Sequence, residues 1–194
     1  FGMIQAHSSL EHNYLRDGFW AQSMAEELVN PKITASILVR MEDVTDKINA
    51  GLNAGMSESE RTKKVNEICR KLESEAVKGT NLAANIKPYF NGNQYFLSVF
   101  KIFRDVRLVG APNSAIGKFG GDTDNWTWPR HTGDFSVLRI YAGPDNEPAA
   151  ISDKNVPYKP AKFFKISARG VQEGDFTMVF GYPGTTNEYL TSYA

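Results

Sequence analysis

The pattern of apolar and polar positions divides the chain into a mixed N-terminal region, one long helix and a series of strands. Over residues 5–28 apolar side chains occur at helical spacing with a break at Gly18, which predicts a short helix, a turn and a second short helix that ends at Pro31. Residues 33–41 alternate between apolar and polar, as expected of a strand. A helical turn is predicted next, at residues 44–48.

The strongest local signal is a helix that begins near Ser57. Ser57 and Glu60 have the spacing of a capping box, and the residues that follow on one helical face are Val65, Ile68, Cys69, Leu72 and Ala76. The opposite face is charged and predicted to be solvated. Because no His lies near Cys69 in the sequence to activate its thiol, we interpret Cys69 as a small buried hydrophobe and not as a nucleophile.

After Gly79 the pattern becomes that of strands. The dipeptide Asn91-Gly92 suits the positive φ angles of a type I′ turn and predicts a hairpin whose second strand spans residues 95–103. Strands are also predicted at 106–109 and at 135–141, the latter apolar on both faces and therefore central in a sheet. Residues 145–160 read as a linker, and short strands follow at 163–167 and 176–180. The predicted fold class is mainly β, with an inserted helical segment at about 43–78.

Composition narrows the function classes. The chain has 194 residues, 41% of them hydrophobic, which is enough for a core; Lys plus Arg and Asp plus Glu number 22 each, so no net charge attracts nucleic acid or an anionic membrane surface. The sequence contains no run of about eighteen apolar residues, so it does not predict a membrane-spanning helix. The single cysteine cannot form an intrachain disulfide, and no Cys/His group has zinc-finger spacing.

The segment from Gly120 to Phe135, GGDTDNWTWPRHTGDF, is the densest in chemical groups. Its Gly and Pro residues predict a long surface loop. Trp126 and Trp128 could either anchor this loop or, with Asn125, line a site for a sugar or a peptide, and the residues alone leave both interpretations open. His131 is interpreted as an orienting or loop-packing residue.

Asp134 has two interpretations. The spacing alone favours a turn residue that accepts hydrogen bonds from neighbouring N–H groups. The alternative is a carboxylate held at the start of a strand to orient a catalytic His. No G-x-S-x-G or G-[DN]-S-G motif supplies a nucleophile, so a hydrolase would not have its whole active site in these residues.

The histidines and aspartates do not form a convincing metal site. His7 and His12 are five residues apart and fall on different faces of a helix, and the GDTD sequence lacks the rest of a calcium-binding loop. We therefore predict no metal ion.

Three segments carry a resemblance to a known family. IQAHSSLEHNYLRDGFW at 4–20, FRDVRLVGAPNSAIGKFGGDTDNWTW at 103–128 and PRHTGDF at 129–135 closely resemble the bacterial serine exopeptidases that include dipeptidyl-peptidases 7 and 11 and dipeptidyl aminopeptidase BII. The motif NW-x-WPRHTGDF is highly specific, and the likeness runs over nearly the whole chain. It implies a chymotrypsin-like double β-barrel that carries a large helical domain. Residues 1–150 would form most of the first barrel, and residues 151–194 a linker and the opening strands of an incomplete second barrel.

The resemblance also implies a function. Enzymes of this kind release N-terminal dipeptides from peptides through an acyl-enzyme, without a metal or cofactor. Asp134 matches the triad carboxylate, which reverses the interpretation from spacing, and Asn125 and Trp126 match positions that bind the free α-amino group of the substrate. The family's catalytic His lies in a TNHHCG-like motif directly upstream of Phe1, and its Ser lies beyond Ala194. The chain is therefore expected to be an inactive fragment of a serine-type dipeptidyl-peptidase.

The expected partner is a peptide with a free N-terminus, and the resemblance further suggests a homodimer of the full-length protein and a periplasmic or cell-surface location in a Gram-negative bacterium. Two alternatives remain open: an aromatic-lined peptide- or sugar-binding module without catalysis, and a structural domain without a ligand.

Overall fold

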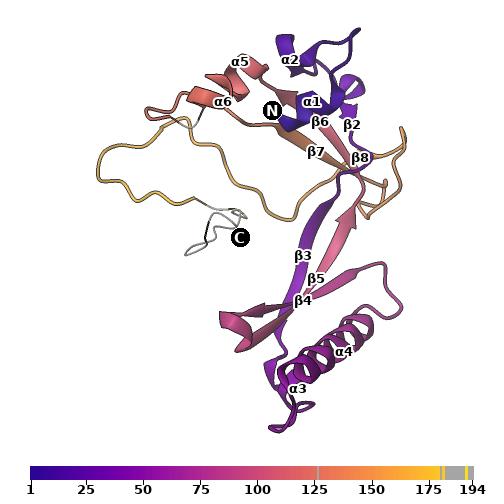
Figure 1. Ribbon diagram of the computed structural model, residues 1–194. Coiled ribbons are helices and arrows are strands. Elements are labelled where there is room, and N and C mark those ends of the chain that lie inside the picture. The colour runs from indigo at the N-terminus through magenta and orange to yellow at the C-terminus, as the bar shows by residue number, and fades with distance from the viewer. Residues whose placement is uncertain (126, 180, 182–190, 192–194) are drawn as a thin grey trace. The chain divides into compact units, whose positions relative to one another are not determined.

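The computed structural model describes residues 1–125, 127–179, 181 and 191 (Figure 1). It divides into two units, Phe1–Lys159 and Pro160–Ala194. The first unit contains all the helices and strands of the described residues, arranged as two antiparallel sheets with helices packed against them. The functional residues predicted above all belong to this unit.

The first sheet is built around strand β6, Asp105–Ala111, most of whose residues are buried. Its strand order is β1 (Phe19–Trp20), β6, β7 (Val137–Ala142) and β8 (Val156–Pro157), and β2 (Leu28–Val29) also pairs with β6. Helix α1 (Gly2–His7) buries its Ile4 against Leu108 and Ala111 of β6, and residues of α2 (Tyr14–Asp17) join this cluster. The start of the chain is therefore fixed to the middle strand of the sheet.

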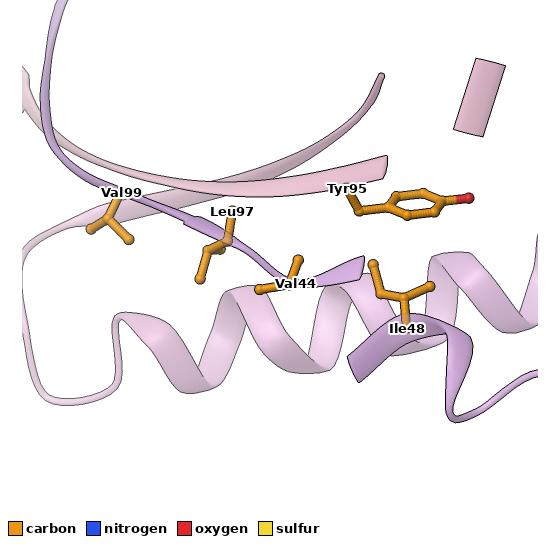
Figure 2. Close-up of a cluster of buried hydrophobic side chains, with 5 residues drawn as sticks. All are labelled: Val44, Ile48, Tyr95, Leu97 and Val99. Atoms are coloured by element: carbon orange, nitrogen blue, oxygen red, sulfur yellow. The ribbon is translucent and has the colours of Figure 1, made fainter. Parts of the chain in front are cut away.

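The second sheet has the order β3 (Ala35–Asp43), β5 (Gln94–Phe103) and β4 (Ala83–Tyr89). Helices α3 (Thr45–Asn49) and α4 (Glu58–Ala76) lie in the chain between β3 and β4 and cover one face of this sheet (Figure 1). Figure 2 shows the core between the sheet and the helices, formed by Val44, Ile48, Tyr95, Leu97 and Val99. The predicted strand at 33–41 and both predicted helices of the insertion are thus observed.

Helix α4 forms as its sequence predicts. Ser57 Oγ accepts from the Glu60 N–H at 3.3 Å, and Glu60 Oε2 accepts from the Ser57 N–H at 2.9 Å, which completes the capping box. All five predicted face residues pack against the core of the second sheet. Cys69 is one of them; its burial, with the nearby charge of Glu73, raises the pKa of the thiol and supports the structural interpretation.

The hairpin around Asn91-Gly92 is present, but its loop is longer than predicted. Tyr89 pairs with Gln94, so four residues connect β4 and β5 where a type I′ turn would use two. Asn91 and Gly92 do adopt positive φ, at 57° and 84°, and Phe90 does so as well, at 50°. The positive φ angles therefore extend one residue further toward β4 than the dipeptide alone predicts.

Two regions differ from their predictions because tertiary pairing decides their structure. Only the first part of residues 5–28 is helical; residues 19–29 instead form β1, a 3₁₀ turn (Met24–Glu26) and β2, since both strands find hydrogen-bond partners on β6. The linker predicted at 145–160 is wrong over residues 152–158, which supply β8 and hold a buried carboxylate of β6.

The strands predicted at 163–167 and 176–180 do not form in the described residues of the second unit. A strand needs a partner for its backbone N–H and C=O groups, and no ladder reaches these residues within the part of the chain that the structure describes. The end of the second predicted strand, Phe180, lies outside the described residues.

Candidate functional site

Asp134 lies just before β7, and its carboxylate contacts the start of the chain. Asp134 Oδ1 is 2.6 Å from the backbone nitrogen of Phe1, across 133 positions of sequence. The Asp134 side chain is 56% exposed. The carboxylate therefore faces solvent and, on one side, the residue that opens helix α1.

The residues before and after Asp134 each make a contact that fixes the backbone. The Gly133 N–H donates to the Ile116 carbonyl at 2.9 Å, and Ile116 belongs to α5 (Ser114–Gly117). On the other side the Phe135 ring packs against Trp20 of β1, with ring centroids 6.1 Å apart. Trp20 in turn lies so close to Gly110 of β6 that a side chain there would overlap the indole. Asp134 is thus anchored to both a helix and the first sheet.

The loop before Asp134 is more ordered locally than its sequence predicts. Residues Gly121–Asp124 form a helical turn, α6, which begins after Gly120 in the left-handed region, at φ 79°. Asn125 ends this turn, and its Oδ1 accepts a hydrogen bond from Thr132 Oγ1 at 2.6 Å. The side chain of Asn125 is therefore tied to the residue two positions before Asp134.

The aromatic residues of the loop separate into different environments. Trp128 is 85% exposed. His131 makes an edge contact with the Phe119 ring, at 5.7 Å between centroids, as its interpretation as a loop-packing residue predicts. Trp126, predicted to contact the substrate amine, lies outside the described residues.

A buried charge cluster that sequence analysis missed lies on β6 of the first sheet. The Asp105 carboxylate is fully buried and accepts two hydrogen bonds from Arg107, at 2.9 and 2.8 Å, and one from Asn155 Nδ2 at 2.8 Å. Burial alone would raise the pKa of Asp105, but the hydrogen bonds from Arg107 and Asn155 and the charge of Arg107 outweigh it, so the pKa is lowered. The spacing of two along a strand places both residues on one face, which is the signal that could have revealed the pair.

The cluster continues to β7. The Arg107 guanidinium carbon lies 4.0 Å from the centre of the Tyr141 ring, and Tyr141 Oη donates to Glu27 Oε2 at 2.9 Å. Glu27 also accepts from Arg139 Nε at 2.8 Å. Burial, and then the hydrogen bond to Glu27, raise the pKa of Tyr141. Every charge in this cluster is matched by an opposite one, so we interpret it as structural support for the sheet.

The histidines predicted to be poorly placed for a metal ion are engaged elsewhere. His7 Nε2 lies 2.8 Å from Asn30 Oδ1, and His12 stacks on Tyr14. Within the described ranges no group of three or more His, Cys, Asp or Glu side chains could hold a metal ion. No helix in the same ranges is long and apolar enough to cross a membrane.

Comparison with known proteins identifies the family, because the family model described as Peptidase S46 matches residues 1–194. The chain belongs to the peptidase S46 family. A relative from Capnocytophaga gingivalis, named Asp/Glu-specific dipeptidyl-peptidase, is 53% identical over 194 residues, which are 100% of this chain and 27% of the relative. Dipeptidyl-peptidase 7 of Porphyromonas endodontalis is 48% identical over 193 residues, 100% of this chain and 24% of that protein. This S46 chain therefore spans about a quarter of the length of the curated relatives it matches.

The fold matches solved structures of a relative. The crystal structure of Porphyromonas endodontalis DPP11 in complex with substrate has a TM-score of 0.78 and 45% identity, over 90% of this chain and 26% of that one. The complex of the same protein with the dipeptide Arg-Asp has a TM-score of 0.74 and 46% identity, over 90% and 26% of the two chains. These matches confirm the predicted fold class, a mainly β partial barrel with an inserted helical segment, and they confirm the predicted family.

Proposed function

We propose that this chain is the part of a serine-type dipeptidyl-peptidase that carries the triad carboxylate, Asp134, and part of the subsite for the substrate's free α-amino group, Asn125 and Trp126. The catalytic His and Ser would come from outside residues 1–194. The whole enzyme would release N-terminal dipeptides from peptides through an acyl-enzyme, without a metal or cofactor. Residues 1–150 would form most of its first barrel and residues 151–194 the beginning of its second.

The observation that carries this proposal is the contact between Asp134 and the backbone nitrogen of Phe1, at 2.6 Å. The family resemblance puts the catalytic His in a motif directly before Phe1. A triad carboxylate must reach Nδ1–H of the His to fix its tautomer and to stabilise the imidazolium. A carboxylate that lies beside Phe1 is close in space to the residue that the resemblance places directly after this motif.

The amine subsite explains why such an enzyme would cleave only after the second residue of a peptide. A buried ammonium group must be matched by acceptors, and acceptors at a fixed distance from the nucleophile allow only one peptide bond to reach it. Asn125 supplies a carbonyl oxygen for this purpose. The relatives carry both the name Asp/Glu-specific dipeptidyl-peptidase and the name dipeptidyl-peptidase 7 at similar identity. We therefore limit this proposal to recognition of the free N-terminus and release of a dipeptide.

The test is to express the reading frame that contains this chain and to measure hydrolysis of dipeptidyl fluorophores and labelling by a fluorophosphonate, in parallel with the 194-residue chain. We expect turnover and labelling only in the longer protein. Labelling of the 194-residue chain would refute the assignment of the nucleophile to another segment.

The matched pair of variants is Asp134→Asn and Asp122→Asn in the longer protein. Asp122 lies in the same loop, is exposed and pairs with Lys118. We expect a loss in kcat of about 10⁴-fold for the first, the size seen when a triad carboxylate is made neutral, and no loss for the second. Turnover that survives Asp134→Asn or Asp134→Ala would show that the triad assignment is wrong.

A binding module without catalysis is the second candidate, favoured by the high exposure of the Trp128 ring. Titration with peptides that have free or acetylated N-termini separates the two candidates, because only the peptidase needs the free amine. We further propose that the full-length protein is a periplasmic or cell-surface homodimer. Fractionation of the producing cells and sedimentation of the purified protein test these two points.

A further inference from the structure

Thr132 is the residue whose position suggests a role beyond the proposed triad and amine subsite. Among the described residues from 120 to 138, all are exposed except Asn125, Thr132 and Gly133, which are half-buried. Asn125 and Thr132 are joined by the 2.6 Å hydrogen bond, and Gly133 is bonded to helix α5. The least exposed part of this loop is therefore the place where Asn125 and Thr132 are hydrogen-bonded to each other.

We infer that Thr132 is a positioning residue that holds the Asn125 amide with its oxygen available to the substrate's α-ammonium group, and that it fixes the distance from this acceptor to Asp134. This inference rests on the proposed function of Asn125. A carbonyl oxygen has two lone pairs, so Oδ1 can accept from Thr132 and still accept from an ammonium group.

The chemistry of the amide makes the Thr132 hydroxyl important. An Asn side chain can turn about its last bond and exchange its oxygen for its NH₂ group, which is a donor and would face the positive ammonium unfavourably. In the structure the Thr132 hydroxyl donates to Oδ1, and this hydrogen bond restrains the amide in the orientation that presents its oxygen. Without it, a fraction of the molecules would present the wrong group, and apparent affinity falls with the competent fraction.

The connection to Asp134 follows from the backbone. Thr132 is two residues before Asp134, and the residue between them, Gly133, is held by Ile116. The hydrogen bond to Asn125 therefore transmits the position of this anchored segment to the end of α6. A substrate amine bound at Asn125 would sit at a fixed distance from the triad carboxylate, as dipeptide counting requires.

The experiment compares Thr132→Val, Thr132→Ser and Thr127→Val in the longer protein described above. Val keeps the shape of Thr and removes the hydroxyl, Ser keeps the hydroxyl, and Thr127 is a threonine of the same loop that is exposed. Two quantities are measured for each: kcat/KM for a dipeptidyl fluorophore with a free amine, and the rate constant of labelling by a fluorophosphonate, which carries no amine.

We expect Thr132→Val to lower kcat/KM by about threefold to tenfold, the range of one lost hydrogen bond, mainly through KM. Fluorophosphonate labelling should be unchanged, since the nucleophile does not depend on the amine. Thr132→Ser should restore kcat/KM, and Thr127→Val should change neither quantity. An equal loss in both rates would mean that Thr132 only supports the fold, and no loss in either would equally overturn the inference.

A double-mutant cycle with Asn125→Ala distinguishes this inference from the proposed function. If Thr132 acts through Asn125, Thr132→Val should have no further effect once the amide is gone. A full effect in the Asn125→Ala background would overturn the positioning role alone and leave the amine subsite intact. If Asn125→Ala itself leaves kcat/KM unchanged, the proposed amine subsite is wrong, and the role of Thr132 is refuted with it.

Discussion

Replacing Asp105 by Asn should destabilise the chain strongly, although the change removes only a charge. The carboxylate is fully buried, and the Arg107 side chain that it bonds is only 10% exposed. In the variant this guanidinium loses its counterion. One of the two carboxylate oxygens that accept its hydrogen bonds is replaced by an NH₂ group, which is a donor. Removing one partner of a buried ion pair costs about 3–5 kcal/mol, and we expect a loss near the lower value, about 3 kcal/mol, because Arg107 also donates to the Ser152 carbonyl.

The assay is urea unfolding of the 194-residue chain followed by circular dichroism. With a slope of about 2 kcal/mol per molar urea, a loss of about 3 kcal/mol lowers the midpoint by about 1.5 M. The matched control is Asp17→Asn. Asp17 also accepts two hydrogen bonds from one arginine, Arg16, at 2.7 Å each, but this pair is on the surface, with side chains 53% and 74% exposed. Its midpoint should not change measurably, since water screens the pair.

The dependence of stability on pH independently checks that the charge of Asp105 stabilises the fold. The folded pKa of Asp105 is lowered, so its charge stabilises the fold above the unfolded pKa of about 3.9, and this contribution is lost as the pH falls toward the folded pKa. The deficit of Asp105→Asn should therefore be full near neutral pH and shrink in acid. Replacing both partners, Asp105→Leu with Arg107→Met, should recover much of the stability. Equal midpoint shifts for the Asp105 and Asp17 variants would refute the reasoning.

Three further predictions concern other elements. Ser57→Ala should lower the stability of the chain by about 1 kcal/mol in thermal unfolding, while Ser57→Asn should nearly preserve it, because only the former removes the cap. Gly110→Ala should cost about 1–3 kcal/mol and change the tryptophan fluorescence, since the new methyl group overlaps the Trp20 ring. A thiol reagent should modify Cys69 more slowly in the folded chain than in urea, because burial raises the pKa of its thiol; equal rates would contradict its position in the core.

Elements that depend on neighbouring residues could be predicted, and elements that depend on distant partners could not. Helix α4 follows from a local cap and a local apolar period, both present in the sequence. Strands β1 and β2 are two residues long each and exist because β6 offers them hydrogen-bond partners. The polar residues of 152–155 read as a linker because their partner, Asp105, is about fifty positions away.

The candidate site illustrates the same limit. From spacing alone Asp134 is a turn residue, and its exposure of 56% agrees with that interpretation. Its contact with Phe1 joins positions 133 residues apart, which no local pattern encodes. Only the specific motif around it indicated a catalytic role. The Asn125 to Thr132 bond spans seven positions in a segment without a helical or strand period, so it too could be found only in the structure.

Rigidity and reactivity are encoded separately in the proposed site. Gly133, Phe135 and Asn125 each contact a partner inside this chain, so the loop that carries the carboxylate is anchored at three points within it. Reactivity depends on a base and a nucleophile that we propose come from elsewhere, and a carboxylate without them performs no chemistry. If the proposal holds, the 194-residue chain prefers a free-amine peptide to its acetylated form and yet cleaves neither, because the proposed acceptor for the amine lies in this chain and the proposed bond-breaking groups lie outside it.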